Sequence, residues 1–260
     1  NGGLVAKELV QRLDERGMGD IVENIIYVAV PELGTPEAIL SMLHGHSQDL
    51  AFGMVLSKNN SRMFSQNMPG AYGLLPSQKF FENNPITVIS DMFKNNIDIS
   101  SFIQMKDFVL SNIFSKASTT ETNIPLLLNS YLFSLANSFH SDIDNWKPAS
   151  TTKTLSIFGW GLPTSKGIKY KQDPHCEKNK NIICNVEPIQ ISENSGDGTV
   201  LTKSNSRNSD STVYFNLNQL YSDLDININH ANILESQDLL SFLNDKIENK
   251  GVASSSYQKY

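Results

Sequence analysis

The spacing of apolar residues along the first thirty positions predicts a helix followed by a buried strand. Leucines and valines recur at helical intervals over residues 2–16, and Gly17 and Gly19 end that helix. The continuous apolar run at residues 25–30 is typical of a strand buried on both faces of a parallel sheet, and Pro31 ends it. A helix and a buried strand form half of a repeating α/β unit, so a further strand is expected before Asn1.

The pattern changes over residues 33–149, where helical stretches alternate with polar loops rich in asparagine and serine. Helices are predicted over residues 37–43, 86–94, 100–114 and 126–139, and none has the continuous apolar character of a central strand. So long a stretch between two sheet strands exceeds a simple crossover connection. This part of the chain is therefore predicted to be an inserted, mainly helical cap.

The sheet pattern resumes after the cap. A strand is predicted over residues 154–158, a hairpin from residues 168–171 and 182–191, and a last strand over residues 212–216. An amphipathic helix is predicted over residues 236–248. Its inward-facing side chains are expected to be Leu239, Leu240, Leu243 and Ile247.

These elements predict an α/β protein with a mostly parallel sheet and an inserted cap. We expect four segments, which are a helix and strand of the sheet domain, the cap, the rest of the sheet domain, and a flexible tail. In that order they cover residues 1–32, 33–150, 151–250 and 251–260.

Composition and charge argue against two classes of protein. Hydrophobic residues make up 39% of the 260 residues, yet no apolar run approaches the ~18 residues needed to cross a bilayer. The 21 lysines and arginines are scattered, and 27 acidic residues outnumber them, which gives a formal net charge of −6. Binding to nucleic acid by phosphate neutralisation needs clustered positive charge, so no nucleic-acid partner is expected.

The two cysteines, Cys176 and Cys184, lie in a polar stretch beside His175. A structural zinc ion takes four ligands, and His175 is the only nearby imidazole, so a metal site is disfavoured. Two interpretations stay open, a short disulfide and a pair of free thiols. The disulfide is the favoured one, and it would indicate an oxidising compartment, hence a secreted or cell-envelope protein.

The start of the chain, Asn1-Gly2-Gly3, leads directly into the first predicted helix. Small residues allow a strand to turn sharply into a helix. In a nucleophile elbow, G-x-S-x-G, the serine lies on such a turn, and the next residue donates its backbone N–H to the oxyanion hole. If Asn1 is that next residue, the serine immediately precedes Asn1 and is not in this chain. The alternative is that two glycines merely begin a helix.

Two later motifs carry an acid and a base. Asp197 lies between two glycines in Ser195-Gly196-Asp197-Gly198-Thr199-Val200, which predicts an exposed tight turn. His230 precedes the closing helix, and the other histidines (His44, His46, His140 and His175) are interpreted as incidental. Each motif alone has a simpler explanation, as a solvated turn or a chance histidine. Together with the elbow they follow the order Ser…Asp…His of α/β-hydrolases.

Several segments carry a resemblance to a known family. They are Asn1-Gly2-Gly3-Leu4-Val5-Ala6, Val28-Ala29-Val30-Pro31-Glu32-Leu33-Gly34-Thr35-Pro36, Ala71-Tyr72-Gly73-Leu74-Leu75-Pro76-Ser77, Gly159-Trp160-Gly161-Leu162-Pro163-Thr164, and Gly196-Asp197-Gly198-Thr199-Val200 with Ser204. The chain resembles the C-terminal part of an α/β-hydrolase of the lipase and lecithin:cholesterol acyltransferase-like family, from residue 1 to about residue 245. One departure is Glu32, where the family often has other residues, and it leaves the local binding surface open.

The resemblance implies an α/β-hydrolase fold with a helical cap and a serine esterase or lipase that acts on lipid or acyl esters. His230 would be the general base, Asp197 would orient it, and the backbone N–H of Asn1 would be an oxyanion donor. No metal or organic cofactor is implied. The implied partners are the ester or lipid substrate, the N-terminal portion of the same protein, and transiently a membrane or lipid surface.

The sequence leaves two alternatives to an ester hydrolase open. An acyltransferase uses the same acyl-enzyme and differs in the acceptor of the acyl group. A non-catalytic binding module with a degenerate hydrolase fold is the second alternative, and the retained Asp197 and His230 speak against it. Because the serine is expected before Asn1, residues 1–260 by themselves are expected to be inactive.

Overall fold

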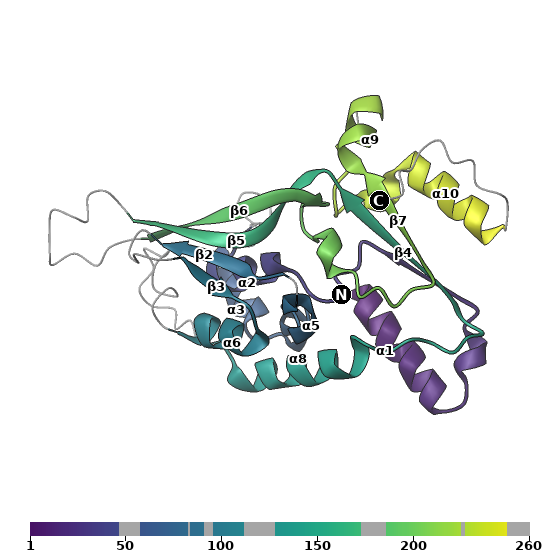
Figure 1. Cartoon of the computed structure of the whole chain (residues 1–260), viewed down its shortest axis with the longest axis horizontal. Coiled ribbons are helices and arrows are strands. Elements are labelled where there is room, and N and C mark those ends of the chain that lie inside the picture. Colours follow the sequence, from purple (N-terminus) through teal and green to yellow (C-terminus); the bar gives the residue numbers. More distant parts are fainter. Residues whose placement is uncertain are drawn as a thin grey trace, which may run out of the picture. The chain divides into compact units, whose positions relative to one another are not determined.

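The computed structural model describes residues 1–46, 58–82, 84–90, 96–111, 128–172, 186–224 and 227–248. The chain divides into two compact units. Figure 1 shows the ribbon with colours that follow the residue number. Unit 1 consists of Asn1–Glu32, Asn145–Thr164 and Glu193–Tyr260, and unit 2 of Leu33–Asp144 and Ser165–Ser192. Within the described ranges, no helix is both long and apolar enough to cross a bilayer.

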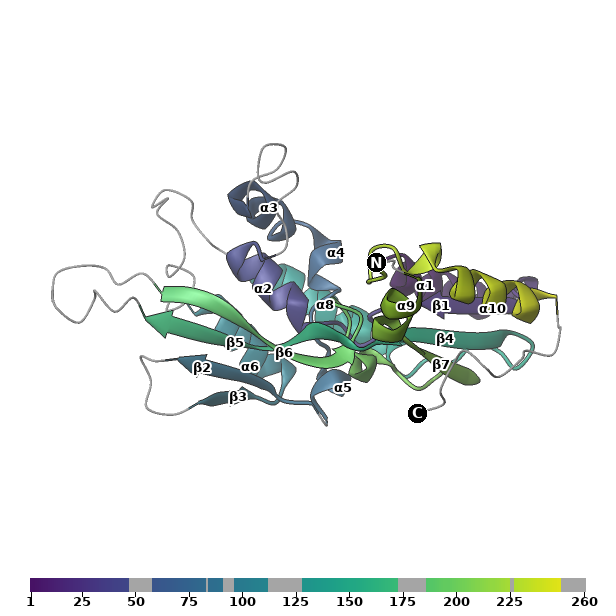
Figure 2. The ribbon, with the colours of Figure 1, turned by 90° about the horizontal axis from the view of Figure 1, so that it is seen from above.

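Unit 1 is built on a three-stranded parallel sheet in the order β1-β4-β7. Helix α1 lies on one face of this sheet, and α10 lies with α9 on the other (Figures 1 and 2). Most of the elements predicted for this part of the chain are confirmed, whereas α9 was not predicted. The bounds are α1 Gly2–Glu15, β1 Asn24–Val28, β4 Lys153–Trp160, β7 Ser211–Asn216, α9 Leu217–Leu224 and α10 Gln237–Ile247, with short 3₁₀ turns at Gly19–Ile21, Thr202–Ser204 and Ile233–Glu235.

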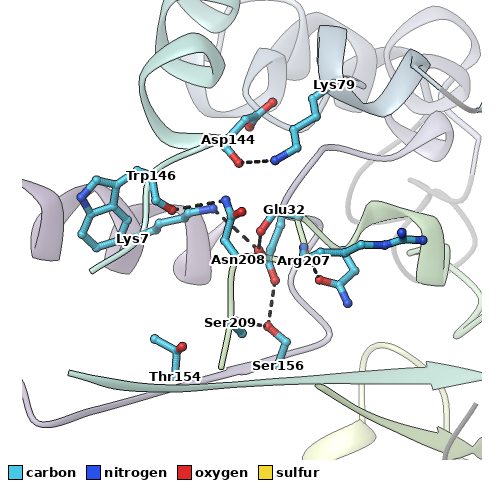
Figure 3. A network of polar contacts seen from close by, with 12 residues as sticks. Lys7, Glu32, Lys79, Asp144, Trp146, Thr154, Ser156, Arg207, Asn208 and Ser209 are labelled. Carbon is cyan, nitrogen blue, oxygen red and sulfur yellow. Dashed lines mark hydrogen bonds and ion pairs between the residues drawn. The ribbon is translucent and has the colours of Figure 1, made fainter. Parts of the chain in front are cut away.

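The two faces of β4 differ in character. Leu155 and Ile157 are buried in the apolar cluster that also contains Leu239 and Phe242 of α10. Side chains alternate along a strand, so Thr154 and Ser156 point to the opposite face, as Figure 3 shows. The face of the sheet that meets α1 therefore contains buried hydroxyl groups.

The predicted inward face of the last helix is partly wrong. Leu239 and Phe242 are buried and Leu243 packs against the same cluster, at the i, i+3 and i+4 spacing of one helical stripe. Leu240 lies about a quarter turn from this stripe and is 37% exposed. Ile247, the last residue of the helix, is 68% exposed.

Most of a four-stranded sheet, in the order β3-β2-β5-β6, belongs to unit 2, and its strands are visible side by side in Figure 2. Strand β2 pairs parallel with β5 and antiparallel with β3. The predicted pairing of two segments after the cap is confirmed by β5 and β6, whereas Cys176, Cys184 and His175 lie outside the described residues. The strands are β2 Ile86–Ser90, β3 Ile97–Ile99, β5 Leu162–Gln172 and β6 Val186–Gly196.

The prediction of a helix over residues 86–94 is wrong, because its described part is strand β2. Ile86 and Val88 are buried, and they alternate with Thr87 at the period of a strand. Three of the five residues of this run carry β-branched apolar side chains, which favour a pleated sheet. The middle segment of the chain is therefore mixed in secondary structure.

The other predicted helices of unit 2 are confirmed with shifted bounds. The first of them, α2, is buried along its whole length. Thr35 is its N-cap, Pro36 is its first residue, and Gly45 ends it with a left-handed φ of 62°. The confirmed helices are α2 Pro36–His44, α6 Phe102–Leu110 and α8 Ser130–Ile143. Three further short helices were not predicted: α3 Lys58–Ser65, α4 Pro69–Tyr72 and α5 Gln78–Phe81.

Candidate active site

The turn that carries Asp197 follows directly after β6 and needs both of its glycines. Gly198 has a φ of 97°, which side chains with a Cβ rarely adopt. Gly196 lacks room instead, because a Cβ there would lie 2.5 Å from both Thr164 Oγ1 and the Val200 carbonyl oxygen. The hydroxyl of Thr164 accepts a hydrogen bond from the Gly198 backbone N–H at 2.9 Å. The Gly-Asp-Gly motif is thus fitted to one tight turn.

The carboxylate of Asp197 is held by the backbone of its own turn. Its Oδ1 accepts hydrogen bonds from the N–H groups of Thr199, at 3.0 Å, and Val200, at 2.7 Å. Its Oδ2 accepts from His230 Nδ1 at 2.9 Å. Asp197 is only 1% exposed. The carboxylate is therefore oriented toward the histidine by backbone donors, and it is not the solvated turn of the simpler explanation.

His230 is joined to Asp197 through both its backbone and its side chain. Its N–H donates to the Asp197 carbonyl oxygen at 2.9 Å, in addition to the bond between the side chains. A carboxylate accepts only, so Nδ1 is the donor in this bond, and in the neutral imidazole Nε2 then holds a lone pair. The side chain is 32% exposed, so the ring reaches the surface. This is the arrangement in which an imidazole can act as a base at Nε2.

A pocket of about 290 Å³ joins the start of α1 to His230. Asn1 is the N-cap of α1, and its carbonyl oxygen accepts from the N–H groups of Leu4 and Val5. The lining residues come from the start of the chain, the end of β1 and the His230 loop: Asn1, Gly2, Gly3, Val28, Ala29, Val30, Pro31, His230, Ala231, Ile233 and Leu234. The structure thus places Asn1 and His230 on one pocket, with Asp197 buried behind His230.

The close approach of α1 to the end of β1 depends on Gly3. A Cβ at Gly3 would lie 2.2 Å from Val30 Cγ2, so a larger residue would push the helix and the strand end apart. Ala29, also on the pocket wall, has a φ of 53°, an uncommon conformation for a non-glycine residue. The pocket wall is therefore built from tightly constrained backbone.

The described histidines that were interpreted as incidental make contacts within unit 2. His44 Nε2 lies 2.8 Å from the hydroxyl of Tyr170, and burial lowers its pKa to about 3, with smaller effects of Arg62 and His46. His140 bridges Asp144 and the Gly73 carbonyl oxygen, and the Nδ1 of His46 lies 2.8 Å from Glu37 Oε1. These contacts are typical of histidines that support a fold.

Sequence reasoning missed the roles of Thr164 and Glu32. Thr164 accepts a hydrogen bond from the Gly198 backbone N–H, and only its position a few residues after a glycine turn could have drawn attention to it. Glu32 stood out only as a departure from the family that left the local binding surface open, and the structure shows that it is 1% exposed. Its carboxylate is bonded to buried hydroxyl groups of β4 and of a later loop.

The parallel sheet, the helices on both of its faces and the acid turn define an α/β-hydrolase fold, which confirms the predicted fold class. A model of the lecithin:cholesterol acyltransferase family matches residues 2–236, so the chain belongs to this family and the predicted resemblance is confirmed.

One solved structure illustrates the similarity of fold. A chain in "The crystal structure of Tle4-Tli4 complex" is similar with a TM-score of 0.51 and 15% sequence identity. The match covers 78% of this chain and 50% of that chain, so this chain spans half the length of the protein it resembles. No curated protein matches the sequence.

Proposed function

We propose that this protein is a serine hydrolase of carboxylic esters, with lipid or acyl esters as the substrate class. The observation that carries the proposal is the hydrogen bond between Asp197 and His230. His230 lines the same pocket as the first residues of the chain. Membership of the lecithin:cholesterol acyltransferase family supports acyl esters as substrates. The decayed binding module is disfavoured, because Asp197 is held by backbone donors in an orientation that serves His230.

In this proposal the nucleophile is a serine immediately before Asn1. Its Oγ–H proton passes to His230 Nε2 while Oγ bonds to the ester carbonyl carbon, and the backbone N–H of Asn1 stabilises the oxyanion. The carbon–oxygen bond to the leaving alcohol then breaks, and His230 returns the proton to that oxygen. Water repeats the sequence to release the acid. Asp197 holds the Nδ1–H tautomer and stabilises the imidazolium.

We further propose that unit 2 serves as the cap of this enzyme. Most of its residues, Leu33–Asp144, are inserted between β1 and β4, and the remainder, Ser165–Ser192, includes most of β5 and of β6. If an alcohol instead of water accepts the acyl group from the acyl-enzyme, the same catalytic residues would perform acyl transfer. The lipid surface, the secreted or envelope location and the disulfide stay predictions, as does the absence of any cofactor.

The test compares two histidines with similar surroundings in the full-length protein, which includes the residues before Asn1. His46 is 34% exposed at its side chain and pairs through Nδ1 with a carboxylate, so it is a close match to His230. Hydrolysis of nitrophenyl esters of increasing acyl length is expected to fall by at least ~10³-fold in His230→Ala and to stay within about twofold in His46→Ala.

A fluorophosphonate probe provides a second, independent measurement. It is expected to label the residue immediately before Asn1, and labelling should depend on His230. Full hydrolysis in His230→Ala, or labelling at a different position, would contradict the assignment. Product analysis in the presence of an added alcohol separates hydrolase from acyltransferase, since only the latter forms a new ester.

A further inference from the structure

A buried carboxylate links three parts of unit 1 beneath the proposed site. Glu32 Oε1 accepts a hydrogen bond from Ser156 Oγ at 2.9 Å, and Oε2 accepts one from Ser206 Oγ. Lys7 Nζ lies 3.7 Å from the same Oε2, which makes an ion pair too long for a direct hydrogen bond. Figure 3 shows Lys7 and Ser156 reaching Glu32 from α1 and from β4.

This ion pair is unusual because both of its members are buried. The side chains of Lys7 and Glu32 are 3% and 2% exposed. Removing two charges from water offsets much of their attraction, so a buried ion pair is weak evidence for a stabilising role. By contrast, Arg12 of the same helix pairs with Glu8 and Glu15 at the surface. The buried pair therefore calls for an explanation other than stability.

Each element that Glu32 contacts also carries a part of the proposed site. Lys7 lies about one and a half turns from the start of α1, where Asn1 lines the pocket. Ser156 lies on β4, which continues to Gly159, and a Cβ there would come within 3.0 Å of Asp197 Cβ. Ser206 belongs to the loop that leaves the acid turn. Glu32 thus links the helix that begins beside Asn1 to two segments that adjoin Asp197.

We propose that Glu32, paired with Lys7, is a positioning residue that sets the start of α1 relative to the Asp197–His230 pair. This inference rests on the proposed function. A second constraint acts on the same helix, because Gly3 packs closely against Val30, two residues before Glu32. The Gly3 contact limits the distance between the helix and the end of β1, and the ion pair fixes the helix at a second point along its axis. Together they fix the direction in which the Asn1 N–H points.

The test uses three variants of the full-length protein: Glu32→Gln, Lys7→Met and the double variant. Glutamine at position 32 loses the charge but retains hydrogen-bonding atoms for Ser156 and Ser206. Glu32→Gln leaves the charge of Lys7 uncompensated, and Lys7→Met leaves that of Glu32 uncompensated. Both single variants are expected to lower kcat roughly 10- to 100-fold with little change in KM, because misplacement affects the chemical step. Both should also lower Tm.

The double variant separates positioning from stability. It leaves no uncompensated buried charge, so its Tm is expected to return close to that of the unaltered protein. Its kcat is expected to stay low, because the contact that sets α1 is still missing. The matched control, Arg12→Gln, removes two exposed ion pairs from the same helix and should leave both kcat and Tm unchanged.

Recovery of kcat together with Tm in the double variant would show that the pair is only structural and would overturn the inference. So would unchanged kcat in both single variants. An unaltered full-length protein that shows no His230-dependent hydrolysis would instead overturn the proposed function, and the inference with it. Activity of the unaltered protein is therefore measured first, which keeps the two failures distinct.

Discussion

The glycines on either side of Asp197 are required for different physical reasons, and substitution should separate them. Gly198→Ala places a Cβ on a residue with φ 97° where its nearest neighbour, Leu162 Cδ1, is 4.0 Å away, so only backbone strain of about 1–2 kcal/mol is expected. Gly196→Ala forces a Cβ against Thr164 and the Val200 carbonyl oxygen, so it should destabilise unit 1 more. Urea unfolding of both variants measures the difference.

The same pair of variants has a distinct effect on the proposed site. Gly196→Ala displaces the Val200 backbone, whose N–H holds Asp197, so it should also lower the rate of ester hydrolysis. Gly198→Ala keeps the hydrogen bonds of Asp197 and should lower that rate less. Equal losses of stability in the two variants would contradict this account of the turn.

Functional residues that belong to a short motif could be predicted from the sequence. Residues whose partners are distant in the sequence could not. Asp197 between two glycines stands out in the linear sequence, and so does a histidine before the last helix. Glu32 meets Ser156 and Ser206 across separations of 124 and 174 residues, and no short pattern records such a meeting. Its burial followed only from the packing of α1 on the sheet.

Helix α8 is anchored by a buried side chain, His140. His140 Nδ1 lies 2.7 Å from Asp144 Oδ1, and Nε2 lies 3.0 Å from the carbonyl oxygen of Gly73, after α4. His140→Ala removes both contacts and leaves a cavity, so it should destabilise unit 2 by about 3 kcal/mol.

The matched control for α8 is Ser138→Ala, an exposed position on the same helix, which should change stability by less than about 0.5 kcal/mol. Chemical unfolding followed by circular dichroism measures both variants. Similar stability of His140→Ala and Ser138→Ala would show that the two hydrogen bonds contribute little to holding α8.

At the same scale, the strand β2 shows where local pattern is ambiguous. A short apolar run satisfies the period of a helix and that of a strand almost equally, so the surroundings decide. Here β5 offers a parallel partner to Thr87–Ser90, and β5 lies more than seventy positions later in the chain. The run 86–90 therefore becomes a strand because of a pairing that its own sequence does not reveal.

For the molecule as a whole, the two units can be monitored separately. Both tryptophans, Trp146 and Trp160, lie in unit 1, whereas most of the helices in the described part of the chain lie in unit 2. Tryptophan fluorescence therefore reports on unit 1, and far-ultraviolet circular dichroism is weighted toward unit 2. If each unit unfolds cooperatively, the two signals will give two transitions.

Acid is expected to destabilise unit 2 through His44. Its pKa is lowered to about 3 by burial and by the nearby Arg62 and His46, against about 6.5 in the unfolded chain. Between these values the unfolded state binds more protons, so stability falls as pH falls. Lowering the pH from 7 to 5 should cost about 2 kcal/mol, seen as an earlier circular dichroism transition.

The control for this pH dependence is His44→Gln, which retains a hydrogen-bonding group for Tyr170 but does not titrate. The part of the pH dependence due to His44 should disappear in this variant, and the fluorescence transition of unit 1 should not respond to the substitution. An unchanged pH profile in His44→Gln would rule out His44 as the cause.

The elements of unit 1 other than α9, and the three motifs, followed from the linear sequence, because periodicity, glycine turns and motif order are local properties of a chain. The hydrogen bond between Asp197 and His230, the shared pocket of Asn1 and His230, and the burial of Glu32 emerged only in the folded structure. Each of these depends on segments that are distant in sequence and that packing brings together. Local sequence thus pointed to Asn1, Asp197 and His230, and long-range packing determined what these residues contact.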